Sequence, residues 1–301
     1  MDKRWRYLKP DPQVVQALAA DLRCSPVTAS VLANRNISIP AAAHKFLNPS
    51  LQHMRPPFEM QDMDAAVERI ARAIRRREKI LLFGDYDVDG VTATVILFDF
   101  LKKAGAVVGY YIPHRRREGY GLRTQHVERY AVPKDVKLIL TVDCGSGSHG
   151  AVRSARKAGI DVIVTDHHNV SHPLPEAVAV VNPKRPDCRT GFEHLAGAGV
   201  AMALIICLRK KLREKGHWKN SPEPNLRDMC DLVALGTVAD AVPLIEENRL
   251  FCRAGLDVLR SGRHRTGIAA LLSTCGVPHH SLDTEDIAFK LAPRLNAAGR
   301  M

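Results

Sequence analysis

The sequence predicts an α/β protein with a mainly parallel sheet flanked by helices, a helical N-terminal extension and a helical C-terminal portion. Short apolar runs alternate with helical patterns between residues 79 and 182. Helical patterns alone fill the chain before residue 79 and after residue 195. Strands that alternate with helices form βαβ units, and right-handed crossovers make their strands parallel.

The chain opens with the expected N-terminal extension, residues 1–62. Two stretches place apolar residues at helical spacing, residues 8–22 and 25–35, and Asp11 and Ser25 each precede a proline at the first helical position. Residues 46–60 are proline-rich and typical of a linker. Asp62 then opens a helix and the second expected domain, residues 63–301. We expect the arginines of this helix to lie on a solvated face: Arg69, Arg72, Arg75 and Arg76.

The alternating region predicts its elements in order. Strands are expected at residues 79–84, 106–112, 137–143, 161–166 and 177–182. Helices are expected between them at residues 91–105 and 150–159. Three more helices should follow, at residues 197–212, 225–240 and 248–260.

The composition excludes several classes of protein. Hydrophobic residues make up 46% and charged residues 25% of the chain, which is typical of a globular protein and not of a disordered or fibrous one. No long apolar run or signal-like start occurs, so we expect no membrane span and no secretory signal. Seven scattered cysteines without a CxxC pair favour free thiols in the cytoplasm. The net charge of +12 favours a polyanionic partner only weakly.

Acidic and histidine residues follow three of the predicted strands. Asp85, Asp87 and Asp89 follow the first strand, Asp143 follows the third, and the segment Asp166-His167-His168 follows the fourth. The carboxyl ends of parallel strands line one crevice, so these groups should converge. Asp240, at the end of a predicted helix, adds an acid where the helix dipole disfavours one. Gathered carboxylates with an imidazole suit Mn²⁺ or Mg²⁺.

Each feature also has a simpler interpretation. The run from Asp85 resembles an EF-hand loop, but its twelfth position is Ile96, where an EF-hand needs Glu, and a strand precedes it. No glycine-rich nucleotide-binding loop occurs. Asp143 or Asp240 alone could cap a helix or turn, and a single histidine is more often structural. The joint arrangement therefore carries the metal-site prediction.

The motifs resemble those of the DHH phosphoesterase superfamily, and most closely its RecJ-type branch of single-strand-specific exonucleases. The resemblance covers roughly residues 60–301 and rests on these segments in this order: GDYDVDG, TVDCGSGSHGA, VTDHH, NPK, ALGTVADAVPL and RLNAAGR. It identifies residues 63–301 as a DHH phosphoesterase domain. It implies metal-dependent hydrolysis of single-stranded DNA from the 5′ end, in DNA repair and recombination, with other repair proteins as candidate partners.

The resemblance also implies roles for single residues. Two divalent cations, Mn²⁺ or Mg²⁺, would activate a water for attack on the phosphodiester. Asp87 would hold the first cation, Asp89 the second, and Asp143 would bridge both. His167 and Asp240 would complete the shell of the second cation, and Asp85 would support either the first cation or its water. His168 is expected to face the scissile phosphate, so the catalytic set is Asp143, His168 and Asp89. Asp166 is expected to orient the ring of His167.

A basic loop after the second strand is the expected substrate contact. It contains Arg115, Arg116, Arg117 and Arg123, which could follow a phosphate backbone, and Tyr120, which could stack on a base. An exposed basic loop without a ligand is the alternative. In the segment 294–300, Arg294, Asn296 and Arg300 are expected either to reach substrate or to be structural.

Two departures from the family pattern bear on activity. Cys144 stands where the family often has Asn after the bridging acid, and we expect it to be tolerated. The chain ends at Met301, so we expect the DHHA1 and OB-fold domains of whole RecJ proteins to be absent and hydrolysis of DNA to be weak. The alternatives are a phosphoesterase for oligoribonucleotides, cyclic dinucleotides or pyrophosphate, and a non-catalytic nucleic-acid-binding fragment.

Overall fold

A computed structural model describes the chain except for residues 1–5, 7, 171, 172 and 299–301. The chain divides into two compact units, Met1–Met54 and Arg55–Met301. The boundary that we expected at residue 62 stays a prediction.

The first unit contains three helices, α1 (Pro12–Leu22), α2 (Pro26–Asn34) and α3 (Pro40–Leu47). The two expected N-caps are confirmed, because the side chains of Asp11 and Ser25 accept hydrogen bonds from backbone amides of the following first turns. Leu18, Leu32 and Ala43 form its buried centre together with Ala29. Sequence patterns did not indicate α3, which is short and rich in alanine.

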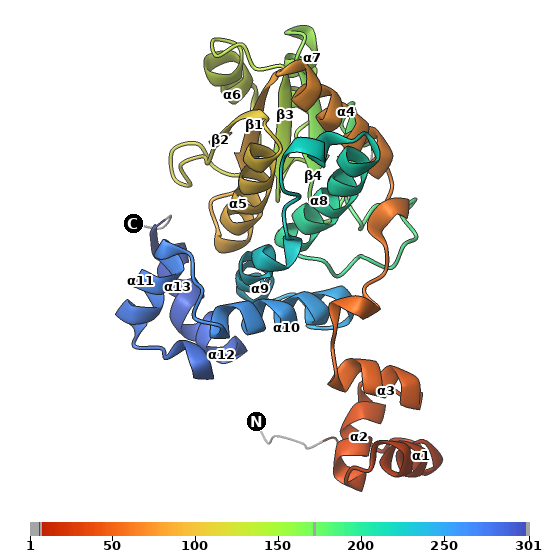
Figure 1. The fold of residues 1–301 in the computed structure, drawn as a ribbon. Helices are drawn as coiled ribbons and strands as arrows, with labels where there is room; N and C mark the ends of the chain where they lie inside the picture. Colours follow the sequence, from red (N-terminus) through yellow and green to blue (C-terminus); the bar gives the residue numbers. More distant parts are fainter. Residues whose placement is uncertain (1–5, 7, 171–172, 299–301) are drawn as a thin grey trace, which may run out of the picture. The chain divides into compact units, whose positions relative to one another are not determined.

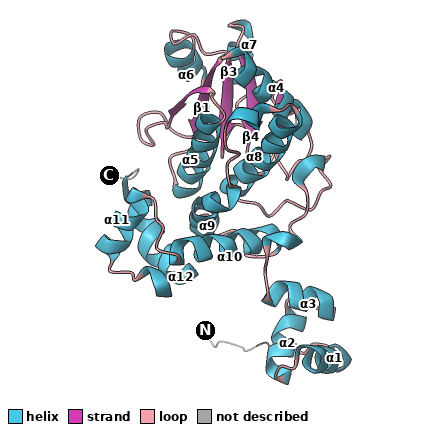
Figure 2. Cartoon of the chain, viewed as in Figure 1, coloured by secondary structure: helices cyan, strands magenta, loops and turns pink. Residues whose placement is uncertain are grey.

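The second unit is built on a five-stranded parallel sheet with the order β2-β1-β3-β4-β5 (Figures 1 and 2). The predicted fold class is thereby confirmed. The strands are β1 (Lys79–Gly84), β2 (Val107–Tyr111), β3 (Leu138–Val142), β4 (Asp161–Thr165) and β5 (Ala179–Val181). Every residue of β3 is buried, as expected for a central strand covered on both faces.

Helices cover both faces of the sheet. One face packs against α4 (Met63–Arg76), α5 (Val88–Lys103) and α8 (Gly197–Glu214). The other packs against α7 (His149–Lys157) and the short helical segment that joins α6 (Thr124–His126) to a π-turn at Val127–Ala131. Figure 1 shows α6 and α7 apart from α5 and α8 across the strands.

One expectation about α4 is wrong. Arg69 does not lie on a solvated face: its side chain is only 5% exposed and contacts Glu78 and Asp161. The arginines of the predicted solvated face include Arg72 and Arg76, whose side chains are 45% and 64% exposed. Asp161 begins β4, so it is the packing of α4 against the sheet that buries Arg69.

The C-terminal portion is helical, as expected. Its longer helices are α9 (Cys230–Ala239), α10 (Glu246–Arg260), α11 (Thr266–Cys275) and α13 (Ala292–Ala298). Shorter helical turns occur there at His217–Asn220, Leu226–Met229, His279–Ser281, Thr284–Asp286 and Ile287–Leu291. Two further turns, Leu51–His53 and Pro57–Glu59, lie between α3 and α4. α9 packs against α5, α8 and α10. Within the described parts of the chain, no helix is long and apolar enough to cross a membrane.

Candidate metal centre

The first acidic loop turns directly from β1 into α5. Asp87 is the N-cap of α5, and its Oδ1 accepts a hydrogen bond from the Gly90 amide at 3.0 Å. The turn is tight enough that a Cβ at Gly90 would lie 2.7 Å from Cβ of Asp85. Asp85 is therefore buried behind the first turn, with Asp87 at its start.

Asp89 is fixed by the start of another helix. Its carboxylate accepts hydrogen bonds from the backbone amides of Gly197, at 2.6 Å, and Ala198, at 2.8 Å, both at the N-terminus of α8. Glycine at position 236 of α9 leaves room for it, because a Cβ there would lie 2.6 Å from Oδ1 of Asp89. The carboxylate is thus held between three helices, and the residue is only 1% exposed.

Asp143 follows β3 in a strained backbone conformation. Its φ of 61° lies in the left-handed region, which a non-glycine residue adopts at a cost. The next helix, α7, begins only at His149, so Asp143 is not a helix cap. Its side chain points into a space that Gly197 leaves open, since a Cβ there would be 2.5 Å from Oδ1. The strain therefore serves to direct this carboxylate towards the centre of the site.

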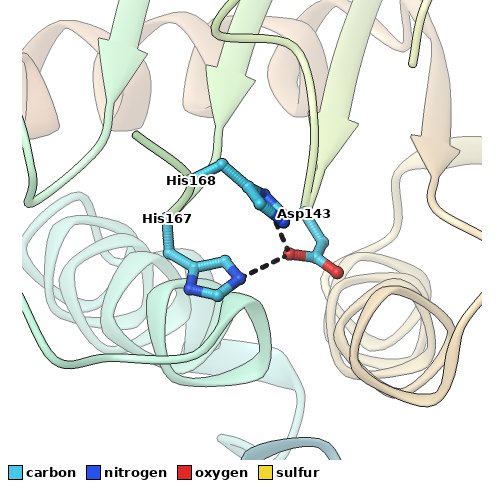
Figure 3. A group of neighbouring side chains, drawn as sticks. All are labelled: Asp143, His167 and His168. Carbon is cyan, nitrogen blue, oxygen red and sulfur yellow. Dashed lines mark ion pairs between the residues drawn. The ribbon is translucent and has the colours of Figure 1, made fainter. Parts of the chain in front are cut away.

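The two histidines after β4 differ in their environment (Figure 3). His167 is buried, and its Nε2 lies 3.1 Å from Oδ1 of Asp143 and 3.6 Å from one carboxylate oxygen each of Asp89 and Asp240. His168 is half exposed, and its Nδ1 lies 3.9 Å from Oδ1 of Asp143. The structure thus places His167 among three acids and His168 at their edge.

Asp166 orients His168, and not His167 as we expected. Its Oδ1 accepts hydrogen bonds from Nδ1 of His168, at 2.9 Å, and from the amides of both histidines. Burial opposes ionisation of this acid, but the bonds from His168 and the Ser146 amide outweigh it and lower the pKa of Asp166 to about 2. A carboxylate can only accept, so Nδ1 of His168 carries a proton and Nε2 is its free nitrogen.

Asp240 is the C-cap of α9, as its position after the predicted helix indicated. It lies at the negative end of the helix dipole, and burial raises its pKa. Burial also raises the pKa of Asp85 to about 6, with the charge of Asp87 adding to the effect. The pKa values of Asp89 and Asp143 are raised in the same way, first by burial and then by neighbouring acids. Neighbouring positive charge would favour ionisation of all four acids.

The ligand atoms fall into three overlapping groups, and within each group all lie within 4.8 Å of one another. The groups are Asp85-Asp87-Asp143, Asp89-His167-Asp240 and Asp143-His167-His168. Among the described residues, Oδ1 of Asp85, Oδ1 of Asp143 and both ring nitrogens of His167 are buried without a hydrogen-bond partner. Buried orphan oxygens and nitrogens in such a set fit divalent cations with oxygen and imidazole ligands. Asp143 belongs to two groups, so two neighbouring cations fit.

The basic loop after β2 reaches this centre. Tyr120 is anchored by its hydroxyl, which donates to the Asp143 carbonyl, at 3.2 Å, and lies 3.1 Å from Nδ1 of His168. The residue is 44% exposed, and its stacking on a base stays a prediction. Arg115 stacks on the ring of Tyr86, 5.0 Å from its centroid. The loop is anchored by Glu118, which accepts hydrogen bonds from the Tyr111 hydroxyl and the His114 amide.

The other predicted substrate residues lie at different places. Arg116, Arg117 and Arg123 are exposed. Asn296 accepts a hydrogen bond from the Val88 amide at 3.0 Å, so α13 supports the first turn of α5. Arg294 is exposed and donates to the Lys290 carbonyl. Arg300 lies outside the described residues.

Sequence reasoning missed a polar support behind the histidines. The Asn182 side chain donates to the Ser146 hydroxyl and to the His168 carbonyl, both at 2.9 Å. The segment NPK, residues 182–184, is one of the motifs that carry the family resemblance, but nothing in the sequence indicated which residues Asn182 contacts. Ser146 and Asn182 thus hold the loop that carries both histidines.

Comparison with known proteins gives concordant matches. A sequence model described as "DHH family, N-terminal domain" matches residues 79–237. The chain is 39% identical over 298 residues to the single-stranded-DNA-specific exonuclease RecJ of Bacillus subtilis, covering 99% of this chain and 36% of that protein. The crystal structure of RecJ in complex with Mn²⁺ from Thermus thermophilus matches 99% of this chain and 40% of that one, with a TM-score of 0.80 and 31% identity.

The Mg²⁺ complex of the same Thermus protein also matches, with a TM-score of 0.69 and 29% identity, over 99% of this chain and 37% of that one. The chain spans well under half the length of each of these relatives.

Proposed function

Because the chain belongs to the DHH family, we propose that it hydrolyses phosphodiester bonds of single-stranded DNA with two divalent cations, Mn²⁺ or Mg²⁺. We further propose that it is the phosphoesterase part of a 5′→3′ exonuclease of DNA repair and recombination in the cytoplasm. The observation that carries the proposal is the pair of ligand groups, Asp85-Asp87-Asp143 and Asp89-His167-Asp240, at one edge of the sheet. The similarity to single-stranded-DNA-specific exonucleases supports the substrate.

The ligand groups define which residues would hold each cation. Asp85, Asp87 and Asp143 would hold the first. Asp89, His167 and Asp240 would hold the second, with Asp143 shared because Nε2 of His167 lies 3.1 Å from its Oδ1. When bound, such a pair of cations lowers the pKa of water, aligns it for attack and stabilises charge on the phosphate.

The protein's own groups orient the substrate around that centre. His168 presents Nε2 outward because Nδ1 is bonded to Asp166, and the same bond raises the pKa of His168. A more basic imidazole can donate a hydrogen bond to a phosphate oxygen as charge accumulates there. Arg115 and the exposed arginines beside it supply positive charge along the approach to the site.

Digestion of labelled single strands tests the proposal. We expect Mn²⁺-dependent release of mononucleotides from a 5′-labelled strand, little cleavage of duplex DNA, and loss of activity in Asp143→Asn. Asp228→Asn, an exposed acid near the start of α9, is the matched control and should remain active. Faster hydrolysis of oligoribonucleotides, cyclic dinucleotides or pyrophosphate than of single-stranded DNA would contradict the assigned substrate. Release from the 3′ end would contradict the assigned polarity.

A further inference from the structure

The sheet order places basic residues at both ends of the row of acids. The loops with Asp85, Asp143 and His167 follow β1, β3 and β4, which are the three middle strands. The basic loop follows the edge strand β2, and the segment with Lys184 and Arg185 follows the opposite edge strand, β5. A strand of nucleic acid that crosses the metal centre along this row passes from one basic segment to the other.

The two cations after β5 differ in what they contact. Arg185 is 6% exposed and its guanidinium binds Asp62, Asp187 and the Val180 carbonyl, so it holds the fold together. Lys184 is exposed. Within the described part of the chain its ammonium forms no ion pair. Of these two residues, Lys184 is therefore the one whose side chain is available to a ligand.

The backbone of Lys184 is tied to the metal centre. Its amide donates to Oδ1 of Asn182 at 2.9 Å, and the amide group of the same side chain donates to the His168 carbonyl. Lys184 also interacts electrostatically with both Asp240 and His168.

The geometry points to Lys184 as a phosphate-binding residue that contacts the polynucleotide on the β5 side of the metal centre, opposite the basic loop. The ligand class is a phosphodiester group of a single strand, so the inference rests on the proposed function. An ammonium on a flexible stem suits this task, because it follows a phosphate without fixing its geometry. Lys184 would thereby hold the strand on the side of His168 and Asp240.

Binding of a hydrolysis-resistant strand tests the inference. The probe is a fluorescent oligothymidylate with phosphorothioate linkages, measured by anisotropy with Mn²⁺ over a range of salt concentrations. For Lys184→Met we expect the slope of log Kd against log salt to fall by about 0.7, which at about 0.1 M salt is roughly fivefold weaker binding. Lys184→Arg should restore both. Lys157→Met is the matched control, because this exposed lysine ends α7 just before the amino end of β4, whereas the acids follow the carboxyl ends of the strands.

The outcomes separate the inference from the function. If the unmodified chain binds and cleaves single strands while Lys184→Met keeps the same slope and affinity, the inference is wrong and the function stands. If Lys157→Met lowers the slope as much as Lys184→Met, the effect is one of net charge, which also overturns the inference. If the unmodified chain neither binds nor cleaves single strands, both are wrong.

Discussion

Replacement of Gly197 by alanine perturbs the metal centre through a single methyl group. The Cβ would lie 2.5 Å from Oδ1 of Asp143 and 2.7 Å from its Cγ, whereas ordinary contacts begin near 3.4 Å. The carboxylate must therefore move by about 1 Å, a displacement that can lower catalysis about 100-fold. The backbone amide that binds Asp89 is retained in the variant, and the three atoms nearest to the added methyl all belong to Asp143.

The same variant should change the stability of the fold much less than it changes catalysis, so a loss of activity can be told from unfolding. Gly197 is the first residue of α8 and has no positive φ, so alanine there restricts the unfolded chain and stabilises by about 0.4–1 kcal/mol, which offsets part of the strain from the clash. Manganese affinity by calorimetry, single-strand hydrolysis and thermal unfolding should be measured together. We expect weaker Mn²⁺ binding and roughly 100-fold slower hydrolysis with a Tm close to that of the parent.

Gly267→Ala is the matched control for this variant. Gly267 lies in the first turn of α11, and a Cβ there would meet nothing within 4 Å. It should leave Mn²⁺ affinity and hydrolysis unchanged. If Gly197→Ala keeps parental Mn²⁺ affinity and activity, the reasoning that Asp143 must occupy its present position is refuted.

Three further predictions concern the basic loop and the helix packing. Tyr120→Phe keeps the ring but loses the hydroxyl next to His168, so kcat should fall about tenfold with strand affinity unchanged; an unchanged kcat would contradict a role for the hydroxyl, and a loss of strand affinity in Tyr120→Ala but not in Tyr120→Phe would indicate base stacking. Charge reversal at residues 115–117 should flatten the salt dependence of strand binding, and an unchanged slope would remove this loop from the interface. Arg69→Ala should lower the free energy of unfolding by about 3 kcal/mol in urea, against less than about 1 kcal/mol for the exposed Arg76→Ala; equal losses would contradict burial of Arg69.

The sequence pattern of a parallel sheet was sufficient to predict that the acidic and histidine residues of the site lie close together. Asp85, Asp143 and His167 are far apart in sequence, but each follows a strand, and parallel strands end at one edge. Asp240 was predicted from its place at a helix end, and it lies there as the cap of α9. Periodicity and strand order therefore carry long-range information about a site when its residues follow regular elements.

Contacts between distant elements could not be predicted in this way. Arg69 follows the pattern of a solvated helix face, and only the position of Asp161 at the start of β4 explains its burial. Asp166 precedes both histidines, and the turn after β4, which sequence does not specify, directs it to His168. The small residues Gly197 and Gly236 have no sequence signal, because their role is the space they leave for Asp143 and Asp89.

A crystal grown with manganese tests the central claim most directly. The anomalous difference map should show two ions, one among Asp85, Asp87 and Asp143 and one among Asp89, His167 and Asp240, with Asp143 between them. A single ion, or ions bound away from these residues, would contradict a two-cation centre at this edge of the sheet.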